Sequence, residues 1–172
     1  CLPSWMVRGQ YKEGEFDGKA VRAYRDEEGV SSESQTETYA ALKLFVDNWR
    51  WKGVPFFLRS GKRLSRKLSE IAITFKQVPH SMFSPFVPER FLTPNVLVLT
   101  IQPHEGLSLT IQAKHPGPKL CISPLKMEFS YDSVFGTNPP NAYERLLLDT
   151  MLGDQSLFVR HDEMEITWSF IT

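Results

Sequence analysis

The residues with the clearest chemical potential are five cations near position 60. They fall within nine consecutive residues and directly follow a short apolar segment: Arg59, Lys62, Arg63, Arg66 and Lys67. Gly61 lets the backbone turn among them. Cations gathered in this way suit one anion or one phosphorylated sugar. The alternative is a solvated connection between two strands, because runs of charge usually lie on exposed surfaces.

The overall composition limits the classes of partner. The 172 residues fit one domain, and 20 basic and 20 acidic side chains give a formal net charge of zero. No general field therefore attracts nucleic acid or an anionic membrane, so an anion site must be local. The chain has no apolar run of the roughly 20 residues that a membrane span needs, and no signal-peptide pattern. We expect a cytoplasmic protein with neither a nucleic-acid nor a membrane partner.

Metal and disulfide chemistry have little support in the sequence. Cys1 and Cys121 form neither a disulfide framework nor a paired ligand motif. Four histidines occur singly, without the spacing of a zinc site: His80, His104, His115 and His161. We therefore predict no metal site, and each histidine is expected on the surface or in a turn.

The first half of the chain predicts a long loop and a helix. Residues Gly14–Ser34 show no period of 2 or 3.6 residues, which favours an extended surface loop. Ser34 and Glu37 then have the spacing of a capping box. Apolar residues from Tyr39 to Trp49 follow at helical intervals, which predicts a helix over Thr36–Trp49.

Alternating residues predict most of the strands. Short β-prone segments occur at Val54–Arg59 and Ile71–Phe75, on either side of the cations. Four prolines between residues 79 and 94 predict an irregular excursion. Strands at Val96–Ile101 and from Leu107, joined by a turn at residues 103–106, predict an antiparallel hairpin. Met127, Phe129 and Tyr131 belong to a further strand.

The C-terminal part of the sequence predicts two helices. The complete pattern of strands and helices predicts an α+β fold. Pro139-Pro140 precedes helical spacing that runs from Tyr143 to Met151 and ends at Gly153, and a second helix starts near Asp162. Hairpin-length turns favour a large, mostly antiparallel sheet with helices packed on one face. No glycine-rich nucleotide-binding motif is present.

Several blocks of sequence, in order, resemble one known family. The blocks are Arg8-Gly9-Gln10-Tyr11, Thr36-Glu37-Thr38-Tyr39-Ala40-Ala41, Arg50-Trp51-Lys52-Gly53-Val54-Pro55-Phe56, Leu58-Arg59-Ser60-Gly61-Lys62, Tyr143-Glu144-Arg145-Leu146 and Val159-Arg160-His161-Asp162-Glu163. This colinear series resembles the C-terminal domain of glucose-6-phosphate dehydrogenase over residues 7–172. Residues 1–6 do not match the family pattern and are expected to be a variant or added leader.

The resemblance implies an NADP-dependent oxidoreductase of the pentose phosphate pathway, which oxidises glucose 6-phosphate to 6-phosphogluconolactone. In that family the NADP and the catalytic histidine belong to an N-terminal Rossmann domain, which is absent from residues 1–172. No catalytic residue is therefore expected in this chain, which alone should be inactive. Its implied partners are glucose 6-phosphate and the Rossmann domain of the same polypeptide.

The resemblance also assigns substrate-binding residues. The lysine after Leu-Arg-x-Gly and the basic residue five positions later reach the bound sugar phosphate in the family, which implies Lys62 and Lys67 here. Arg59, Arg63 and Arg66 are then interpreted as strand-end and surface charge. Gln102 matches a further substrate-side position. Its alternative is a strand-end amide that satisfies backbone groups.

Some family members hold a second, structural NADP on this sheet. In this sequence the corresponding positions are mostly uncharged: Leu68, Thr100, Ser108 and Thr110, with only Arg160 of the expected type. We therefore predict that the structural NADP site is absent. The resemblance further implies a homodimer formed through the sheet. The alternative is that the second face of the sheet is exposed to solvent.

Two other classes of function remain open from the sequence. The first is a catalytically silent sheet module that acts as a regulator or binds partners. The second is a single-stranded nucleic-acid binder, which needs a basic groove lined by exposed rings. The compact cation cluster argues against the second, as does the expected place of Phe75, Phe129 and Tyr131 on the core face.

Overall fold

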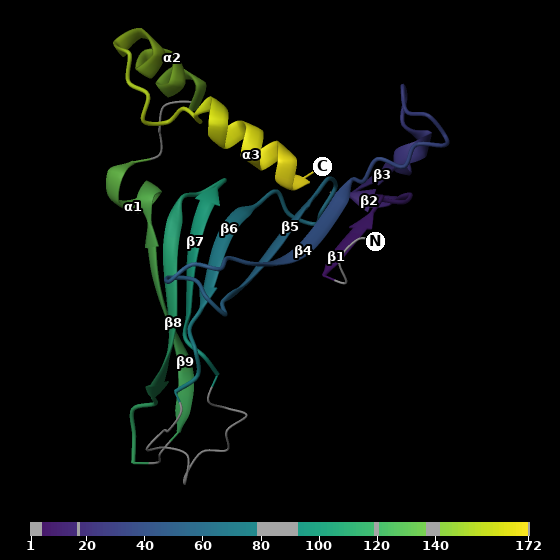
Figure 1. Ribbon diagram of the computed structural model, residues 1–172. Coiled ribbons are helices and arrows are strands. Elements are labelled where there is room, and N and C mark those ends of the chain that lie inside the picture. Colours follow the sequence, from purple (N-terminus) through teal and green to yellow (C-terminus); the bar gives the residue numbers. More distant parts are fainter. Residues whose placement is uncertain (1–4, 17, 79–92, 119–120, 137–141, 172) are drawn as a thin grey trace. The chain divides into compact units, whose positions relative to one another are not determined.

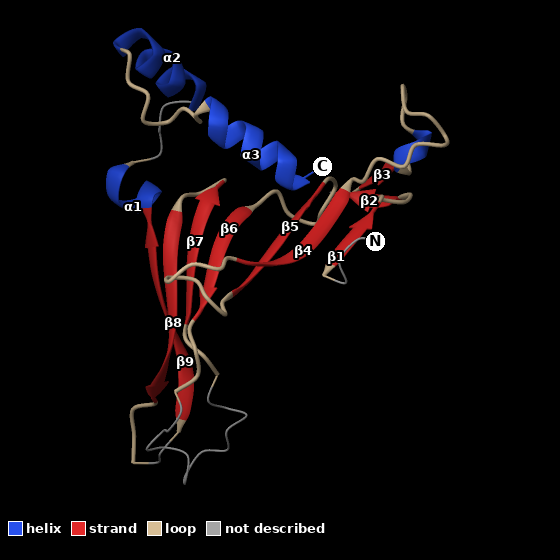
Figure 2. Cartoon of the chain, viewed as in Figure 1, coloured by secondary structure: helices blue, strands red, loops and turns tan. Residues whose placement is uncertain are grey.

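The computed structural model describes residues 5–16, 18–78, 93–118, 121–136 and 142–171. The chain divides into two units, Cys1–Leu68 and Ser69–Thr172. The described residues form both strands and helices (Figure 2), and every strand pairing among them is antiparallel. The α+β class predicted from the sequence is confirmed. The described strands are hydrogen-bonded as sheets of three, two and four strands.

The three-stranded sheet of the first unit has its central strand where the sequence predicted a helix. Its order is β1 (Met6–Gly9), β4 (Tyr39–Phe45) and β5 (Pro55–Gly61). Leu42 of β4 lies opposite Met6 on one side and Leu58 on the other. The segment joining β4 to β5 is a turn in which the Asn48 side chain accepts backbone hydrogen bonds from Arg50 and Trp51.

The predicted helix over Thr36–Trp49 is therefore wrong, and the reason is physical. A central strand is covered along both edges, and here all residues from Tyr39 to Leu44 are partly buried. Such a mostly apolar segment, interrupted only by Lys43, also satisfies a helical pattern. The last residue of that pattern, Trp49, is fully exposed and so lies on no buried face. Ser34 does not cap a helix, because its hydroxyl accepts from the nearby Thr36 amide in a turn.

The predicted loop over Gly14–Ser34 also contains regular structure. Strands β2 (Gly14–Phe16) and β3 (Lys19–Val21) form a two-stranded hairpin, followed by the short 3-10 turn η1 (Tyr24–Asp26). Strands of three residues are too short to show a convincing alternation. This explains why the sequence pattern alone did not reveal them.

The second unit contains the four-stranded sheet. Its strands are β6 (Ser69–Thr74), β7 (Val96–Gln102), β8 (Gly106–Lys114) and β9 (Ile122–Ser130), paired in chain order (Figure 1). The predicted hairpin of β7 and β8 is confirmed. Tyr131, predicted as part of the last strand, instead begins the short helix α1 (Tyr131–Phe135). Most of the predicted proline-rich excursion, residues 79–92, lies outside the described residues.

The register gives this sheet one apolar face. Leu99, Leu107 and Phe129 lie in one cross-strand row, and Leu97, Leu109 and Met127 lie in the next. The opposite face carries rows such as Val98, Ser108 and Glu128. The predicted alternation is thus confirmed. The three aromatic side chains expected on the core face remain exposed in this chain: Phe75 by 47%, Phe129 by 39% and Tyr131 by 48%.

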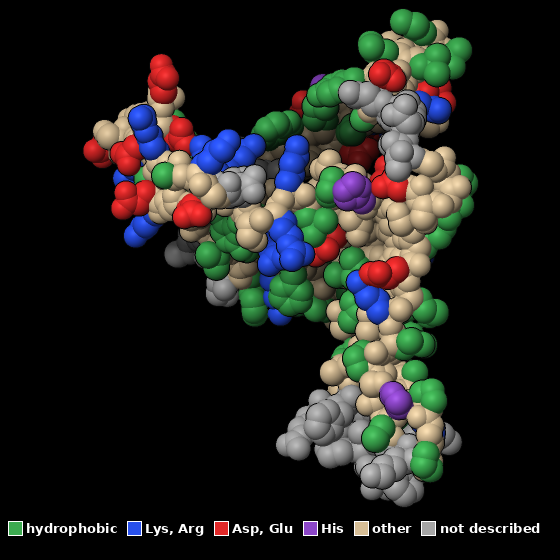
Figure 3. Space-filling model, turned by 180° about the vertical axis from the view of Figure 1, so that it is seen from behind, with side chains coloured by type: hydrophobic (Ala, Val, Ile, Leu, Met, Phe, Trp, Pro, Cys, Tyr) green, Lys and Arg blue, Asp and Glu red, His purple; other side chains and the backbone are tan. Residues whose placement is uncertain are grey.

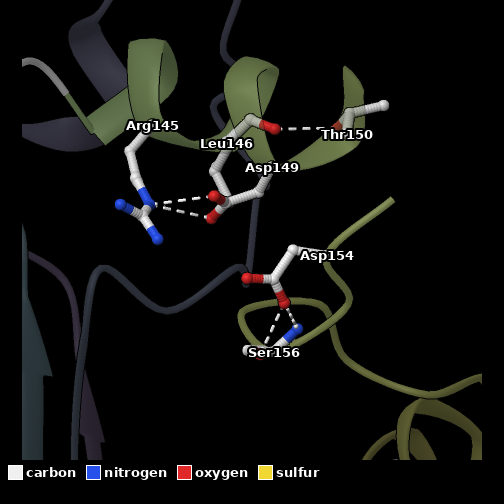
Figure 4. A network of polar contacts seen from close by, with 6 residues as sticks. All are labelled: Arg145, Leu146, Asp149, Thr150, Asp154 and Ser156. Atoms are coloured by element: carbon white, nitrogen blue, oxygen red, sulfur yellow. Dashed lines mark hydrogen bonds and ion pairs between the residues drawn. The ribbon is translucent and has the colours of Figure 1, made fainter. Parts of the chain in front are cut away.

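The predicted C-terminal helices are α2 (Ala142–Leu152) and α3 (His161–Ile171). Gly153 ends α2 in the left-handed region, at φ 73°, and the Asp154 amide donates to the Asp149 carbonyl, as in a glycine-terminated helix. On α2 the Arg145 guanidinium faces the Asp149 carboxylate (Figure 4). No helix in the described ranges is long and apolar enough to cross a membrane.

Candidate functional site

The cation segment, residues 59–67, starts at the end of β5. Arg59 lies in the strand opposite Ala41, whereas Lys62 and Lys67 follow the strand in the connection to residue 68. Both lysine side chains are exposed. Within the described parts of the chain, neither ammonium group forms an ion pair or a side-chain hydrogen bond. The two lysines predicted to bind substrate are therefore accessible cations with no counter-ion among the described residues.

Thr38 fixes the backbone at the start of this segment. Its carbonyl accepts from the Lys62 amide at 2.8 Å, and its own amide donates to the Gly9 carbonyl at 2.9 Å. Its hydroxyl accepts from the Tyr11 amide at 3.0 Å. One residue therefore links the end of β1, the start of β4 and the residue after β5. The Lys62 backbone is held by the sheet although its side chain is exposed.

The three arginines of the segment differ from one another. Arg59 and Arg66 are exposed, as the sequence interpretation expected. Arg63 does not fit that interpretation, because its guanidinium forms an ion pair with Glu27 at 2.6 Å. The neighbouring Tyr11 hydroxyl and then the Glu27 carboxylate raise the pKa of Arg63 above its ordinary value. The sequence interpretation missed Glu27, which has no motif to distinguish it.

Gln102 occupies the last position of β7. Its side-chain amide donates to the Ser69 hydroxyl at 2.9 Å, across the pair that joins β6 and β7. The amide nitrogen is thus engaged within the sheet, which agrees in part with the alternative of a strand-end amide. The amide oxygen remains an acceptor that can receive a hydrogen bond from a ligand. Gln102 belongs to the second unit, whereas Lys62 and Lys67 belong to the first.

An open hollow of about 540 Å³ lies in the first unit beside the end of β1. Three cations, Arg8, Lys12 and Arg25, line it together with one carboxylate, Glu37. Gln10 orders its wall, because its amide donates to the Ser34 and Thr36 carbonyls and accepts from Arg25. Lys62 and Lys67 are not among the residues that line this hollow. On the face shown in Figure 3, Lys and Arg side chains lie among Asp and Glu side chains and exposed hydrophobic ones.

The structure offers little for metal or histidine chemistry. Among the described residues, no group of three or more His, Cys, Asp or Glu side chains could hold a metal ion. His104 lies 3.2 Å from the Asp132 carboxylate, but its side chain is 80% exposed. Cys121 is an exposed free thiol. The groups that the described residues offer to a ligand are therefore cations and amides.

The fold and sequence now identify the class of protein. The structure matches a solved glucose-6-phosphate dehydrogenase in complex with its substrate glucose-6-phosphate, with a TM-score of 0.82 and 36% identity over 95% of this chain and 32% of that one. It also matches the crystal structure of glucose-6-phosphate 1-dehydrogenase from Mycobacterium avium, with a TM-score of 0.71 and 36% identity over 96% and 32% of the chains. These solved structures are oxidoreductases, and this chain has the fold of one part of them.

Sequence comparison identifies the family. The model of the family described as glucose-6-phosphate dehydrogenase, C-terminal domain, matches residues 2–172, and the chain belongs to this family. Glucose-6-phosphate 1-dehydrogenase from Chlamydia muridarum (strain MoPn / Nigg) is 46% identical over 97% of this chain and 33% of the relative. The Bacillus subtilis (strain 168) protein is 42% identical over 99% and 34%. The chain thus spans about a third of the length of these relatives.

Proposed function

We propose that this chain is the substrate-side domain of an NADP-dependent glucose-6-phosphate dehydrogenase. The complete enzyme would oxidise C1 of glucose 6-phosphate, giving 6-phosphogluconolactone and passing a hydride to NADP. It would do so in the cytoplasm, as part of the pentose phosphate pathway. A Rossmann domain of the same polypeptide would hold the nicotinamide and the catalytic base. The match of nearly the whole chain to one C-terminal domain family carries this proposal.

Lys62 and Lys67 are the proposed phosphosugar ligands. Each ammonium group is a compact charge with three donors, suited to phosphate and hydroxyl oxygens. Their role is to bind and orient the substrate, since an ammonium group donates hydrogen bonds and has no lone pair to accept a proton. Their exposure and their lack of an internal partner among the described residues support the assignment. Gln102 of the second unit is the third proposed ligand, through an amide oxygen that accepts no hydrogen bond from the described residues.

Substitution of the two lysines tests this proposal in the complete enzyme. We expect Lys62→Ala and Lys67→Ala each to raise the KM for glucose 6-phosphate by roughly ten- to a hundredfold, the effect of losing a charged hydrogen bond. The KM for NADP should change little. Lys52→Ala is the matched control, because Lys52 is an exposed lysine in the turn before β5. Unchanged kinetics in both test variants would refute the assignment.

We also propose that this domain dimerises through its sheet. Apolar side chains on the four-stranded sheet remain accessible in the single chain, including Leu125 at 52% and Met127 at 46% exposure. Surfaces of this kind are usually covered by a partner or by another domain. Sedimentation of the complete enzyme should give a dimer. A monomer well above micromolar concentration would exclude this assembly.

The residues present do not fit a structural NADP, and we propose that this site is lacking. Thr100 on β7 and Ser108 and Thr110 on β8 offer no positive charge to a 2′-phosphate. Arg160 is already paired with Asp162 at 2.7 Å. We expect calorimetry on this chain to detect no NADP binding that persists in salt. Tight, salt-resistant binding would contradict this prediction.

A further inference from the structure

Arg63 has an unusual backbone for a residue of its type. Its φ is 52°, and it is the one residue other than glycine with a positive φ in the described ranges. A side chain in this left-handed region costs about 1–2 kcal/mol, so surrounding contacts must hold the conformation. The contacts of Arg63 lie far from it in the sequence.

Two residues hold the Arg63 guanidinium. Its Nη2 lies 2.6 Å from Glu27 Oε1, and this pair spans 36 positions of the chain. Its central carbon lies 5.3 Å from the centroid of the Tyr11 ring. The Tyr11 hydroxyl itself donates to Glu27 Oε1 at 3.3 Å. Arg63, Glu27 and Tyr11 therefore form one connected cluster, and the charge of Arg63 is already neutralised within the chain.

The residues of this cluster belong to backbone segments that are hydrogen-bonded to one another. The Tyr11 carbonyl accepts from the Tyr24 amide at 3.1 Å, and the two rings pack edge to face with centroids 5.8 Å apart. The Glu27 amide donates to the Tyr24 carbonyl at 3.3 Å. The Tyr11 amide is bound by Thr38. Glu27 is thus presented by the turn η1, which is itself attached to the end of β1.

Lys62 lies between two anchors. Its own amide is bound by the Thr38 carbonyl at 2.8 Å, and the next residue along the chain is Arg63. Fixing the peptide on both sides restricts the directions in which the Lys62 side chain can leave the backbone. Restricting a binding group before the ligand arrives reduces the entropy lost on binding.

We propose that Glu27, acting through Arg63, is a positioning residue that presents Lys62 to the phosphosugar. The inference rests on the proposed function, because it assumes that Lys62 contacts the substrate. In this proposal, residues 10–38, which include no predicted substrate ligand, fix the position of the cation segment through Glu27 and Arg63. It also explains why Arg63 is not available as a ligand.

The test uses the complete enzyme and two substitutions. Glu27→Gln removes the charge and nearly preserves the shape, and should raise the KM for glucose 6-phosphate by about two- to fivefold, the range expected for a partly exposed ion pair. The kcat and the KM for NADP should stay within about twofold. Adding Arg63→Gln to Glu27→Gln should cause little further loss, because both substitutions break the same contact. Additive losses would overturn the proposal.

Arg63→Gly separates positioning from stability. Glycine accepts a positive φ without strain, so the melting temperature should be nearly maintained while the KM for glucose 6-phosphate still rises. Arg63→Lys keeps the charge and should recover part of the affinity. An unchanged KM in Arg63→Gly would overturn the proposal. So would a change of equal size in all kinetic constants that parallels a fall in the melting temperature. Should Glu27→Gln fail to fold, Tyr11→Phe and Arg63→Gly carry the same test.

Two controls separate this inference from the proposed function. Glu37→Gln removes another exposed carboxylate of the same unit, 3.8 Å from Arg8, and should leave the KM unchanged. Lys62→Ala is measured alongside. If Lys62→Ala leaves the KM unchanged, the proposed function fails. If Lys62→Ala raises the KM and neither Glu27→Gln nor Arg63→Gly does, only the positioning role fails.

Discussion

Gly61 and Tyr39 lie opposite each other across β4 and β5, so close that a Cβ on residue 61 would be 2.9 Å from Tyr39 Cδ2. The Thr38 carbonyl oxygen would be 3.3 Å from the same atom. Residue 61 immediately precedes Lys62. The absence of a side chain at residue 61 therefore allows the Tyr39 ring to pack directly beside the candidate site.

Gly61→Ala should displace the Tyr39 ring and destabilise the first unit by about 1–3 kcal/mol, the usual cost of overpacking. The shift should also raise the KM for glucose 6-phosphate in the complete enzyme. Gly9→Ala is the matched control, because Gly9 faces Tyr39 from the other side and a Cβ added there would meet no atom within 4 Å. Equal melting temperatures for the two variants would contradict the prediction.

Arg145→Ala should destabilise the C-terminal helices. Asp149 is only 1% exposed, and both of its carboxylate oxygens lie close to Arg145 Nε, at 2.9 and 3.0 Å (Figure 4). Removing the guanidinium leaves a buried charge without compensation, and we expect a loss of about 1–3 kcal/mol in the free energy of unfolding. Arg160→Ala breaks an exposed pair and should cost less than about 0.5 kcal/mol in urea unfolding. A larger loss for Arg160→Ala than for Arg145→Ala would refute this account.

Asp154 should contribute to the dependence of stability on pH. Its carboxylate accepts from the Ser156 hydroxyl at 2.6 Å and from the Ser156 amide at 2.9 Å. These two hydrogen bonds, the side-chain one first, lower the pKa of Asp154. A lowered folded-state pKa gives stabilisation that is complete above the unfolded value of about 3.9 and is lost as the pH falls through the folded value.

Ser156→Ala should return the pKa of Asp154 part of the way toward its ordinary value, because only the amide hydrogen bond remains. Carboxyl-carbon NMR titration measures this change directly. Ser133→Ala is a suitable control, since the Ser133 hydroxyl donates to the Ser130 carbonyl and to no carboxylate. An unchanged Asp154 titration in Ser156→Ala would contradict the assigned cause.

The sequence predicted the local features of the fold and failed where pairing was distant. The hairpin of β7 and β8 was predictable because its alternation and turn lie within one short segment. The strand β4 was not, because its partners Met6 and Leu58 come from remote segments that cover both of its edges. Distant pairing can override a local helical pattern.

The residues of the candidate site also differ in whether the sequence alone could predict their role. Lys62 and Lys67 were predicted as ligands from a compact run of cations and a family resemblance. Glu27 was not, because a carboxylate 36 positions from its partner leaves no local pattern. The positive φ of Arg63 was equally hidden, since the sequence there has an arginine where glycine or asparagine would have indicated such a turn.

Asn48 should be critical for the turn that replaces the end of the predicted helix. Its side-chain oxygen accepts from the Arg50 amide at 3.1 Å and the Trp51 amide at 2.8 Å, while its carbonyl accepts from the Lys52 amide at 3.0 Å. Asn48→Ala leaves two backbone donors without this acceptor and should cost about 1 kcal/mol in urea unfolding.

Asn48→Asp keeps an oxygen in the same place and should retain most of that stability. Asp47→Ala, one residue earlier in the same turn, controls for the loss of a polar side chain there. The three variants should rank with Asn48→Ala as the least stable, because the turn depends on the side-chain acceptor at residue 48. If Asn48→Asp is as unstable as Asn48→Ala, the acceptor is not what holds β4 and β5 in register.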